Sequence, residues 1–293
     1  MVALFDTAST GIRVIRPENV TEVDQSLERF EGVKVIAGGT DIMVQLRARR
    51  YSPSALVDIS GIADLDRIDV SPTHVRIGAN ASMTSISDND TLVAEFGCLR
   101  QAAMTVGSKQ IQNMATLVGN IMNASPAADT IPSILLYNGV LNFRSVNGLR
   151  SVKLEEALKS RGKVEHHPGE WVESITVDRF DGHGAAYAKL GRTRGVDIAV
   201  AGAAVIVVAG DVRVAVSAVD ARSRILPNAG RFLRDYLGSE PMQTADLQDV
   251  IRHEINPIDD IRASSGYRSY TTAVLIRRAF ESARLNMTNV SGV

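Results

Sequence analysis

A pair of adjacent glycines near the start of the chain is the first place where a ligand could bind. Gly38 and Gly39 stand between a run that predicts a strand and a run that predicts a helix. Adjacent glycines permit positive φ angles and a close approach of a ligand to the backbone. Amide groups at a helix start lack internal partners and suit a pyrophosphate, to which Thr40 could also donate. The alternative is an ordinary tight turn in which Asp41 caps the helix.

A second candidate segment, residues 115–129, is rich in small and polar residues. Small residues let a backbone lie flat against a planar or phosphorylated ligand. Donors and acceptors recur at short intervals, in Thr116, Asn120, Asn123 and Ser125. Asp129, close to the start of a predicted helix, could accept a hydrogen bond from a ribityl or ribose hydroxyl. The alternative is a polar loop that satisfies its own backbone, with Asp129 as a helix cap.

A third candidate is a predicted strand that carries Tyr187 and Lys189. Side chains alternate along a strand, so these two lie on one face. An aromatic ring and a cation on one face could frame an electron-rich ring, and a cation near a reduced flavin would stabilise its negative charge. The alternative is an exposed strand edge followed by a solvated basic turn.

Other residues of reactive type favour structural roles. His166 and His167 precede a Pro-Gly pair and indicate a solvated turn, and without a third ligand at suitable spacing we expect no metal site. Cys98 lies in an apolar, helical context and is expected to pack rather than react.

Apolar spacing predicts the elements that hold the three candidate segments. Val20, Val23 and Leu27 recur at helical intervals and predict a helix over residues 20–30. Further helices are predicted after Gly39, over residues 92–106, and where Pro132 occupies a first turn. Residues 107–128 have poor periodicity, which predicts a long functional loop. Strands are predicted at residues 33–37, 55–59, 75–79, 139–143, 171–177 and 186–190.

The pattern changes after about residue 180. Strands at residues 198–208 and 212–219 are joined by Ala209-Gly210-Asp211, which is typical of a hairpin. Helices follow at residues 230–237, at 245–254 and near the end of the chain. Strands followed by helices indicate a separate α+β domain, after an α/β first part.

Composition excludes several classes of protein. The chain has 293 residues, of which 45% are hydrophobic, and a net charge of −1. It is therefore expected to fold, and it lacks the charge expected of a nucleic-acid partner. The single cysteine excludes a cysteine-ligated iron–sulfur cluster or a four-cysteine zinc site within this chain. We expect no membrane span and no signal peptide, and hence a cytoplasmic protein.

Taken together and in this order, these segments resemble the FAD-binding (medium) subunit of molybdenum hydroxylases, the family of carbon monoxide dehydrogenase and xanthine dehydrogenase flavoproteins. The resemblance covers nearly the whole chain. Four stretches carry it, at residues 37–41, 116–129, 189–199 and 255–268. One glycine motif alone would be a weak signal, whereas four segments with compatible spacing are specific.

The resemblance implies a fold and a cofactor site. The fold would be a two-lobed FAD-binding domain of the vanillyl-alcohol-oxidase type over residues 1–178, with lobes at about 1–58 and 59–178. An α+β domain of the carbon monoxide dehydrogenase flavoprotein type would occupy residues 179–293. Tyr187 would lie beside the flavin ring as the catalytic candidate. The implied FAD-binding residues are Val35, Ile36, Ala37, Gly38, Gly39, Thr40, Asp41, Ile42, Val106, Thr116, Leu117, Val118, Gly119, Asn120, Ser125, Asp129, Val172, Tyr187 and Lys189.

One residue departs from the family pattern. Relatives usually have Gly-Gly-Asn where this chain has Val118-Gly119-Asn120. Valine resists positive φ, so we expect an extended backbone at Val118 with its side chain turned away from the cofactor.

The resemblance also implies a function. The chain would be an electron-transfer subunit that works beside an iron–sulfur subunit and a molybdopterin subunit and passes electrons through FAD to NAD, quinone or oxygen. The alternative is an autonomous FAD-dependent oxidase or dehydrogenase that acts directly on a small organic substrate. A third possibility is a module that has lost its flavin. The substitution Asp129→Asn is expected to weaken FAD retention more than it lowers the thermal stability of the FAD-free form.

Overall fold

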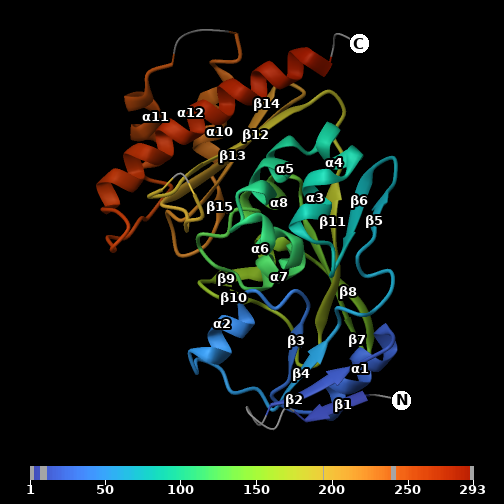
Figure 1. Cartoon of the computed structure of the whole chain (residues 1–293). Coiled ribbons are helices and arrows are strands. Elements are labelled where there is room, and N and C mark those ends of the chain that lie inside the picture. Colours follow the sequence, from blue (N-terminus) through green and yellow to red (C-terminus); the bar gives the residue numbers. More distant parts are fainter. Residues whose placement is uncertain (1–2, 7–11, 194, 239–241, 291–293) are drawn as a thin grey trace.

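The structure, a computed structural model, describes residues 3–6, 12–193, 195–238 and 242–290. In this part of the chain the strands form three sheets of four or five strands and one short hairpin. Helices cover the sheets, and the N-terminal sheet lies at the opposite end of the molecule from the helices α10, α11 and α12 (Figure 1). None of the helices in the described ranges combines the length and apolar character needed to cross a lipid bilayer.

The first sheet positions the glycine pair. Its order is β1 (Ala3–Asp6), β2 (Arg13–Arg16), β4 (Ala55–Asp58) and β3 (Lys34–Ile36). Strand β4 runs parallel to both β2 and β3, and α1 (Val20–Arg29) connects β2 to β3. The chain leaves β3 through the two glycines and enters α2 (Ile42–Arg47). The predicted strand–turn–helix unit is therefore present.

The second sheet is antiparallel throughout. Its strand order is β5 (Ile68–Val70), β6 (His74–Gly78), β11 (Trp171–Asp178), β7 (Val140–Ser145) and β8 (Gly148–Lys153). After β8 come α9 (Leu154–Ala157) and the hairpin of β9 (Leu158–Ser160) and β10 (Lys163–Val164). The residues beyond this hairpin return the chain to β11, whose first residue, Trp171, donates a hydrogen bond of 2.8 Å to Asp24 of α1.

Six short helices form a layer between the second and third sheets. They are α3 (Met83–Asp88), α4 (Asp90–Glu95), α5 (Gly97–Met104), α6 (Lys109–Met114), α7 (Leu117–Met122) and α8 (Ile131–Leu136). The predicted helix over residues 92–106 is broken at Phe96, whose non-helical backbone (φ −116°, ψ 49°) separates α4 from α5. The predicted loop over residues 107–128 is also wrong, since Ser108 and Thr116 each cap a helix of six residues within it.

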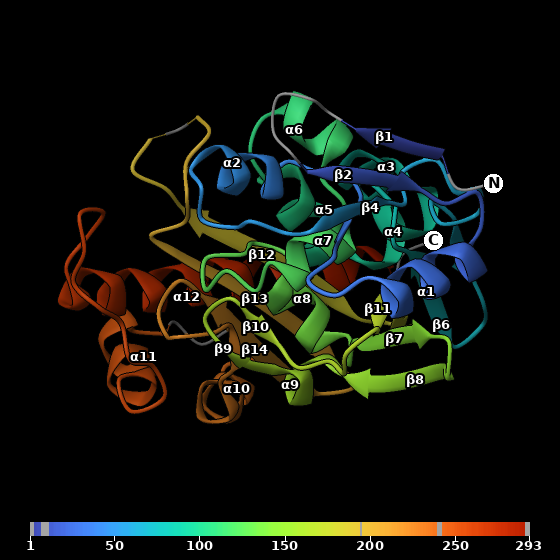
Figure 2. The same cartoon turned by 90° about the horizontal axis from the view of Figure 1, so that it is seen from below.

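The third sheet separates two hydrophobic cores. Its order is β12 (Gly184–Leu190), β13 (Ala201–Val208), β14 (Asp211–Ser217) and β15 (Arg224–Ile225), with the predicted hairpin between β13 and β14. One face packs against α5 and α8, and the other carries α12 (Ser265–Val290), α10 (Pro227–Arg234) and α11 (Thr244–Ile251) (Figures 1 and 2). Alternation along β12 places Tyr187 in the first core and Ala186 in the second.

Candidate functional site

A cleft of about 1150 Å³ lies between the first sheet and the helical layer. One wall is the end of β3 with the glycine turn and α2, and the opposite wall is formed by α7 with the residues before it. The end of the β9–β10 hairpin and the segment that follows it close a third side. Small-molecule sites usually have volumes of about 300–1000 Å³, so this cleft has room for a ligand of dinucleotide size.

The glycine turn leaves no room for side chains. A Cβ atom at Gly38 would lie 1.7 Å from the carbonyl oxygen of Met114, so the turn is packed directly on the end of α6. Gly39 adopts φ +70°, which favours glycine. The backbone amides of residues 38–41 donate no hydrogen bond to any group in the described ranges of the chain. They form a set of free donors at the cleft wall, which is the chemistry that a pyrophosphate requires.

Asp41 stands at the start of α2 but does not cap it with its side chain. Its carboxylate instead accepts a hydrogen bond of 3.1 Å from Nδ2 of Asn123, and Gln45 contacts the same asparagine at 3.4 Å. Burial raises the pKa of Asp41. The alternative of a simple capped turn is therefore wrong, because this side chain ties α2 to the opposite wall of the cleft.

The second candidate segment is largely helical. The Thr116 hydroxyl accepts a hydrogen bond of 3.0 Å from the amide of Gly119 and so caps α7. Asn120 accepts a hydrogen bond of 2.7 Å from the Thr130 hydroxyl. The expected extended backbone at Val118 is wrong, because this residue lies within α7 and lines the cleft. A helical position has negative φ, so valine fits where glycine stands in relatives.

Most of the predicted cofactor-binding residues line this cleft. They are residues 35–42, Val106, Thr116, Val118, Gly119, Asn120 and Val172. Five others do not line it, namely Leu117, Ser125, Asp129, Tyr187 and Lys189. Leu117 is fully buried in the first core, and the Ser125 hydroxyl accepts a hydrogen bond of 3.3 Å from the amide of Ala127. Direct contact with FAD stays a prediction for all of these residues, both those that line the cleft and those that do not.

Asp129, Tyr187 and Lys189 form one buried cluster. The Tyr187 hydroxyl donates to Oδ1 of Asp129 at 2.8 Å, and Nζ of Lys189 donates to Oδ2 at 2.7 Å. Burial raises the pKa of the Asp129 carboxyl, and the Lys189 ammonium opposes that shift. Lys189 also donates to the carbonyl of Thr105 at 3.0 Å, and Thr105 directly precedes the cleft residue Val106. The cluster therefore lies just behind the cleft wall and joins β12 to Asp129, which lies two residues before the start of α8.

Sequence reasoning missed the third side of the cleft. Residues 162–166 and 168–171 line it, including His166, for which we expected only a solvated turn. This segment has no ligand-binding motif. Its position depends on the β9–β10 hairpin and on Glu170, whose carboxylate binds Arg150 through two hydrogen bonds of 2.7 and 2.5 Å. The single tryptophan, Trp171, was the one available signal, and its indole donates to Asp24 at 2.8 Å.

Acid should loosen this segment through Glu170. Its hydrogen bonds to Arg150 lower the pKa of the Glu170 carboxyl from 4.5 to about 2. Because the pKa of Glu170 is lower in the folded state than in the unfolded chain, the ionised carboxylate stabilises the fold at pH values above its unfolded-state pKa. This stabilisation is lost as the pH falls toward 2. We expect Glu170→Gln to reduce the steepness of the acid-unfolding curve below pH 4.5. Thermal unfolding at several pH values measures this, with the exposed Glu156→Gln as control. Identical curves for Glu170→Gln and the unaltered chain would exclude the role.

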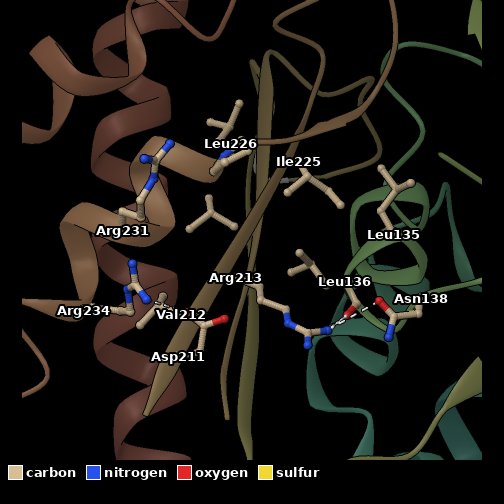
Figure 3. Close-up of a pocket in the computed structure, with 12 residues that line it drawn as sticks. Leu135, Leu136, Asn138, Asp211, Val212, Arg213, Ile225, Leu226, Arg231 and Arg234 are labelled. Carbon is tan, nitrogen blue, oxygen red and sulfur yellow. Dashed lines mark hydrogen bonds and ion pairs between the residues drawn. The ribbon is translucent and has the colours of Figure 1, made fainter. Parts of the chain in front are cut away.

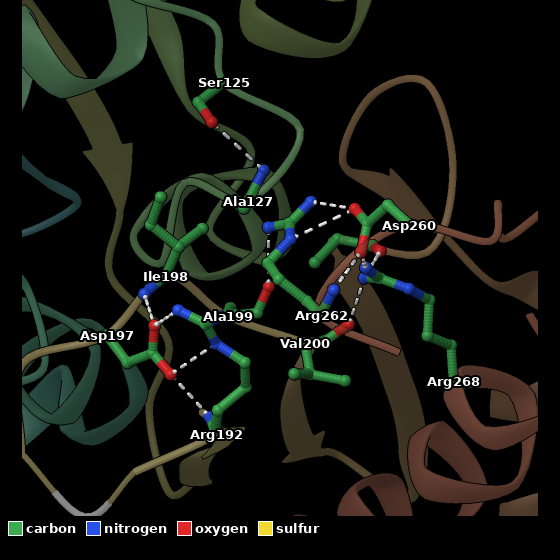
Figure 4. Close-up of polar contacts among 11 residues, drawn as sticks. Ser125, Ala127, Arg192, Asp197, Ile198, Ala199, Val200, Asp260, Arg262 and Arg268 are labelled. Carbon is green, nitrogen blue, oxygen red and sulfur yellow. Dashed lines mark hydrogen bonds and ion pairs between the residues drawn. The ribbon is translucent and has the colours of Figure 1, made fainter. Parts of the chain in front are cut away.

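A further polar network holds the loops beyond Lys189 (Figure 4). Arg268 is fully buried and donates to the carbonyls of Val200 and Ala218 at 2.7 and 3.0 Å. Asp260 accepts from both Arg268 and Arg262 at 2.6 Å, and these ion pairs lower the pKa of its carboxyl. The C-terminal stretch that resembles the family, residues 255–268, therefore has a structural role in this chain.

Asp197 connects the described residues on either side of it. The Asp197 carboxylate accepts from the amides of Arg192 and Ile198 at 2.6 and 2.9 Å. Among the described residues no group of three or more His, Cys, Asp or Glu side chains could hold a metal ion.

Comparison with known proteins agrees with this architecture. A family model described as "FAD binding domain in molybdopterin dehydrogenase" matches residues 9–178, and one described as "CO dehydrogenase flavoprotein C-terminal domain" matches residues 185–283. The glyceraldehyde dehydrogenase medium chain of Sulfolobus acidocaldarius is 30% identical over 273 residues, covering 91% of this chain and 96% of that protein. The carbon monoxide dehydrogenase medium chain of Afipia carboxidovorans is 27% identical over 282 residues, covering 94% and 97%.

Solved structures show the same fold. A chain in the crystal structure of the cyanide-inactivated Cu,Mo-CO dehydrogenase matches with a TM-score of 0.87 at 26% identity, covering 93% of this chain and 97% of that chain. The chain belongs to the FAD-binding flavoprotein family of the molybdopterin dehydrogenases. It is an FAD-dependent oxidoreductase subunit, and the predicted family, fold class and cofactor are confirmed.

Proposed function

We propose that the cleft holds FAD in an extended form, with its pyrophosphate at the glycine turn. The observation that carries this proposal is the set of free amides at residues 38–41, which face a cleft of about 1150 Å³. The hydroxyl and amide side chains of Thr40 and Asn120 add polar contacts along the same walls. The apolar residues Val106, Val118 and Val172 line other parts of the cleft and would exclude water from an apolar ring.

The buried cluster tunes this site from behind the wall. Asp129 holds Tyr187 and Lys189 in one orientation through two hydrogen bonds, and the Lys189 ammonium lies next to the residue that precedes Val106. A fixed cation at this place favours negative charge on a nearby ring system. Bound FAD supplies the electron-accepting chemistry, and these side chains supply orientation and electrostatics.

We further propose that the chain works beside an iron–sulfur subunit and a molybdopterin subunit, and passes electrons through FAD to an external acceptor. Two observations support partners. The chain has one cysteine, Cys98, which is buried and whose thiol pKa is raised by burial to about 11, so the chain itself offers no cluster ligands. Its relatives are named as medium chains of dehydrogenases.

The alternative is an autonomous FAD oxidase or dehydrogenase. Tyr187, the residue considered as the base for such a reaction, is not arranged for this role, because its hydroxyl donates to Asp129 and burial raises the pKa of this phenol well above its ordinary value. The geometry therefore favours the electron-transfer role over direct attack on a substrate.

Two preparations test these proposals. We expect the purified chain, after incubation with FAD, to be yellow and to show no turnover of small aldehydes or N-heterocycles with a dye acceptor. We expect the tagged chain, expressed with its neighbouring reading frames, to copurify with two further chains and with iron and molybdenum by elemental analysis. A colourless chain would exclude the flavin site. Turnover by the yellow chain alone would exclude the subunit role and leave the flavin site intact.

A further inference from the structure

A second hollow lies at the end of α8 and is separate from the flavin cleft. It has a volume of about 400 Å³ and lies between the end of α8, the start of β14 and the helix α10 (Figure 3). Its floor is apolar, because Leu135, Val212 and Leu226 are buried and line it. Its volume is within the range of small-ligand sites, and none of its lining residues also lines the cleft.

The hollow carries an excess of positive charge. Arg231 and Arg234 enter it from α10, and Arg213 enters from β14 on the side of α8 (Figure 3). Asp211 is the one acidic residue among the described residues that line it. Its carboxylate is 3.7 Å from the Arg234 guanidinium, which is too far for a good hydrogen bond. The described residues that line the hollow therefore include three arginines and one acidic residue, and Arg213 lies across β14 from the other two arginines and points toward Asn138 (Figure 3).

Most of the guanidinium donors are not used by the protein. Arg231 makes one hydrogen bond, of 2.6 Å, to Asn228. Nη1 of Arg213 makes two long contacts of 3.4 Å, to the carbonyl of Leu136 and to Oδ1 of Asn138. The same guanidinium lies 4.9 Å from the centre of the Phe180 ring, which holds it in place. A guanidinium has five N–H donors, so each group can still bind an anion.

We propose that this hollow binds a small organic anion with an apolar body and one phosphate or carboxylate group. The planar fork of arginine matches both of these anions, and pairing with them uses the donors that the protein leaves free. The apolar body would cover the floor formed by the leucine and valine side chains. Such a ligand would touch α8 and α10 together, and these helices belong to the segments matched by the two different family models.

Phenyl phosphate is a suitable probe, because it joins an apolar ring to a phosphate group. Inorganic phosphate is the control for the anion without an apolar body, and benzyl alcohol is the control for the apolar body without charge. Each is titrated by calorimetry into the full chain loaded with FAD, so that the cleft is filled. We expect saturable binding of phenyl phosphate that is at least tenfold tighter than that of phosphate, and none of benzyl alcohol. Equal affinity for phosphate and phenyl phosphate, or no saturable binding, would overturn the proposal.

Charge variants locate the site. The double variant Arg231→Gln/Arg234→Gln changes two exposed residues, so it should fold, and we expect it to weaken phenyl phosphate binding at least tenfold. Asp211→Asn removes the opposing carboxylate and should tighten binding severalfold. Arg252→Gln, an exposed arginine outside the hollow, is the matched control and should bind as the unaltered chain does. Unchanged affinity in the double variant would overturn the proposal and leave the flavin site unaffected.

Discussion

Gly38→Ala is expected to abolish FAD retention and to lower the free energy of unfolding by about 3 kcal/mol or more, since overpacking against a rigid backbone exceeds the usual cost of added methylenes. The new Cβ atom would be placed 1.7 Å from the carbonyl oxygen of Met114. The backbone fixes the position of the Cβ atom, and the atom that it meets is a backbone oxygen. One of the two cleft walls must therefore move. Absorbance at 450 nm after desalting measures retained FAD, and thermal unfolding of the FAD-free form measures stability.

A matched alanine substitution separates the clash from the general effect of replacing glycine. Gly61→Ala adds a Cβ atom that meets no atom within 4 Å, and Gly61 has no positive φ. We expect this variant to retain FAD and to unfold like the unaltered chain. If Gly38→Ala retained FAD as well as Gly61→Ala does, the contact between the glycine turn and α6 would not shape the site.

Asp129→Asn is expected to destabilise the FAD-free form by about 3 kcal/mol, because removing one partner of a buried ion pair leaves the other charge uncompensated. The Asp129 and Lys189 side chains are 8% and 11% exposed, and the amide would leave the ammonium unpaired. From the sequence, we expected this substitution to weaken FAD retention more than it lowers the stability of the FAD-free form. The buried ion pair changes that expectation, because it makes the loss of stability large. Chemical denaturation of the FAD-free variant gives the free energy of unfolding.

A double variant tests the buried pair itself. Asp129→Asn/Lys189→Met removes both charges, so we expect it to recover more than half of the lost stability. FAD retention should remain weakened in the double variant, because the cation behind the wall is absent. The single variant Lys189→Met completes the cycle. If the double variant lost as much stability as the two single variants combined, the two side chains would not act as a pair.

The family and the glycine turn could be predicted from the sequence because their signals are local. Two adjacent glycines after a β-branched strand specify a backbone that side chains would obstruct, and no distant residue is needed to recognise it. The strands also followed from their composition, and residues 171–178 agree with the prediction to within one residue. Short helices were harder, because α6 and α7 have six residues each and depend on their caps rather than on periodicity.

The cofactor family, the fold class and most residues of the two principal cleft walls could be predicted from the sequence alone. The three-dimensional structure was needed to show that residues 162–166 and 168–171 close the cleft, and that Asp129 binds Tyr187, 58 positions away. Strand pairing and hairpin packing bring these groups together, and no pattern along the chain encodes a contact between residues so far apart. The same reason explains Val118, whose backbone follows from the cap at Thr116 and the packing of α7 rather than from its own preference for extended structure.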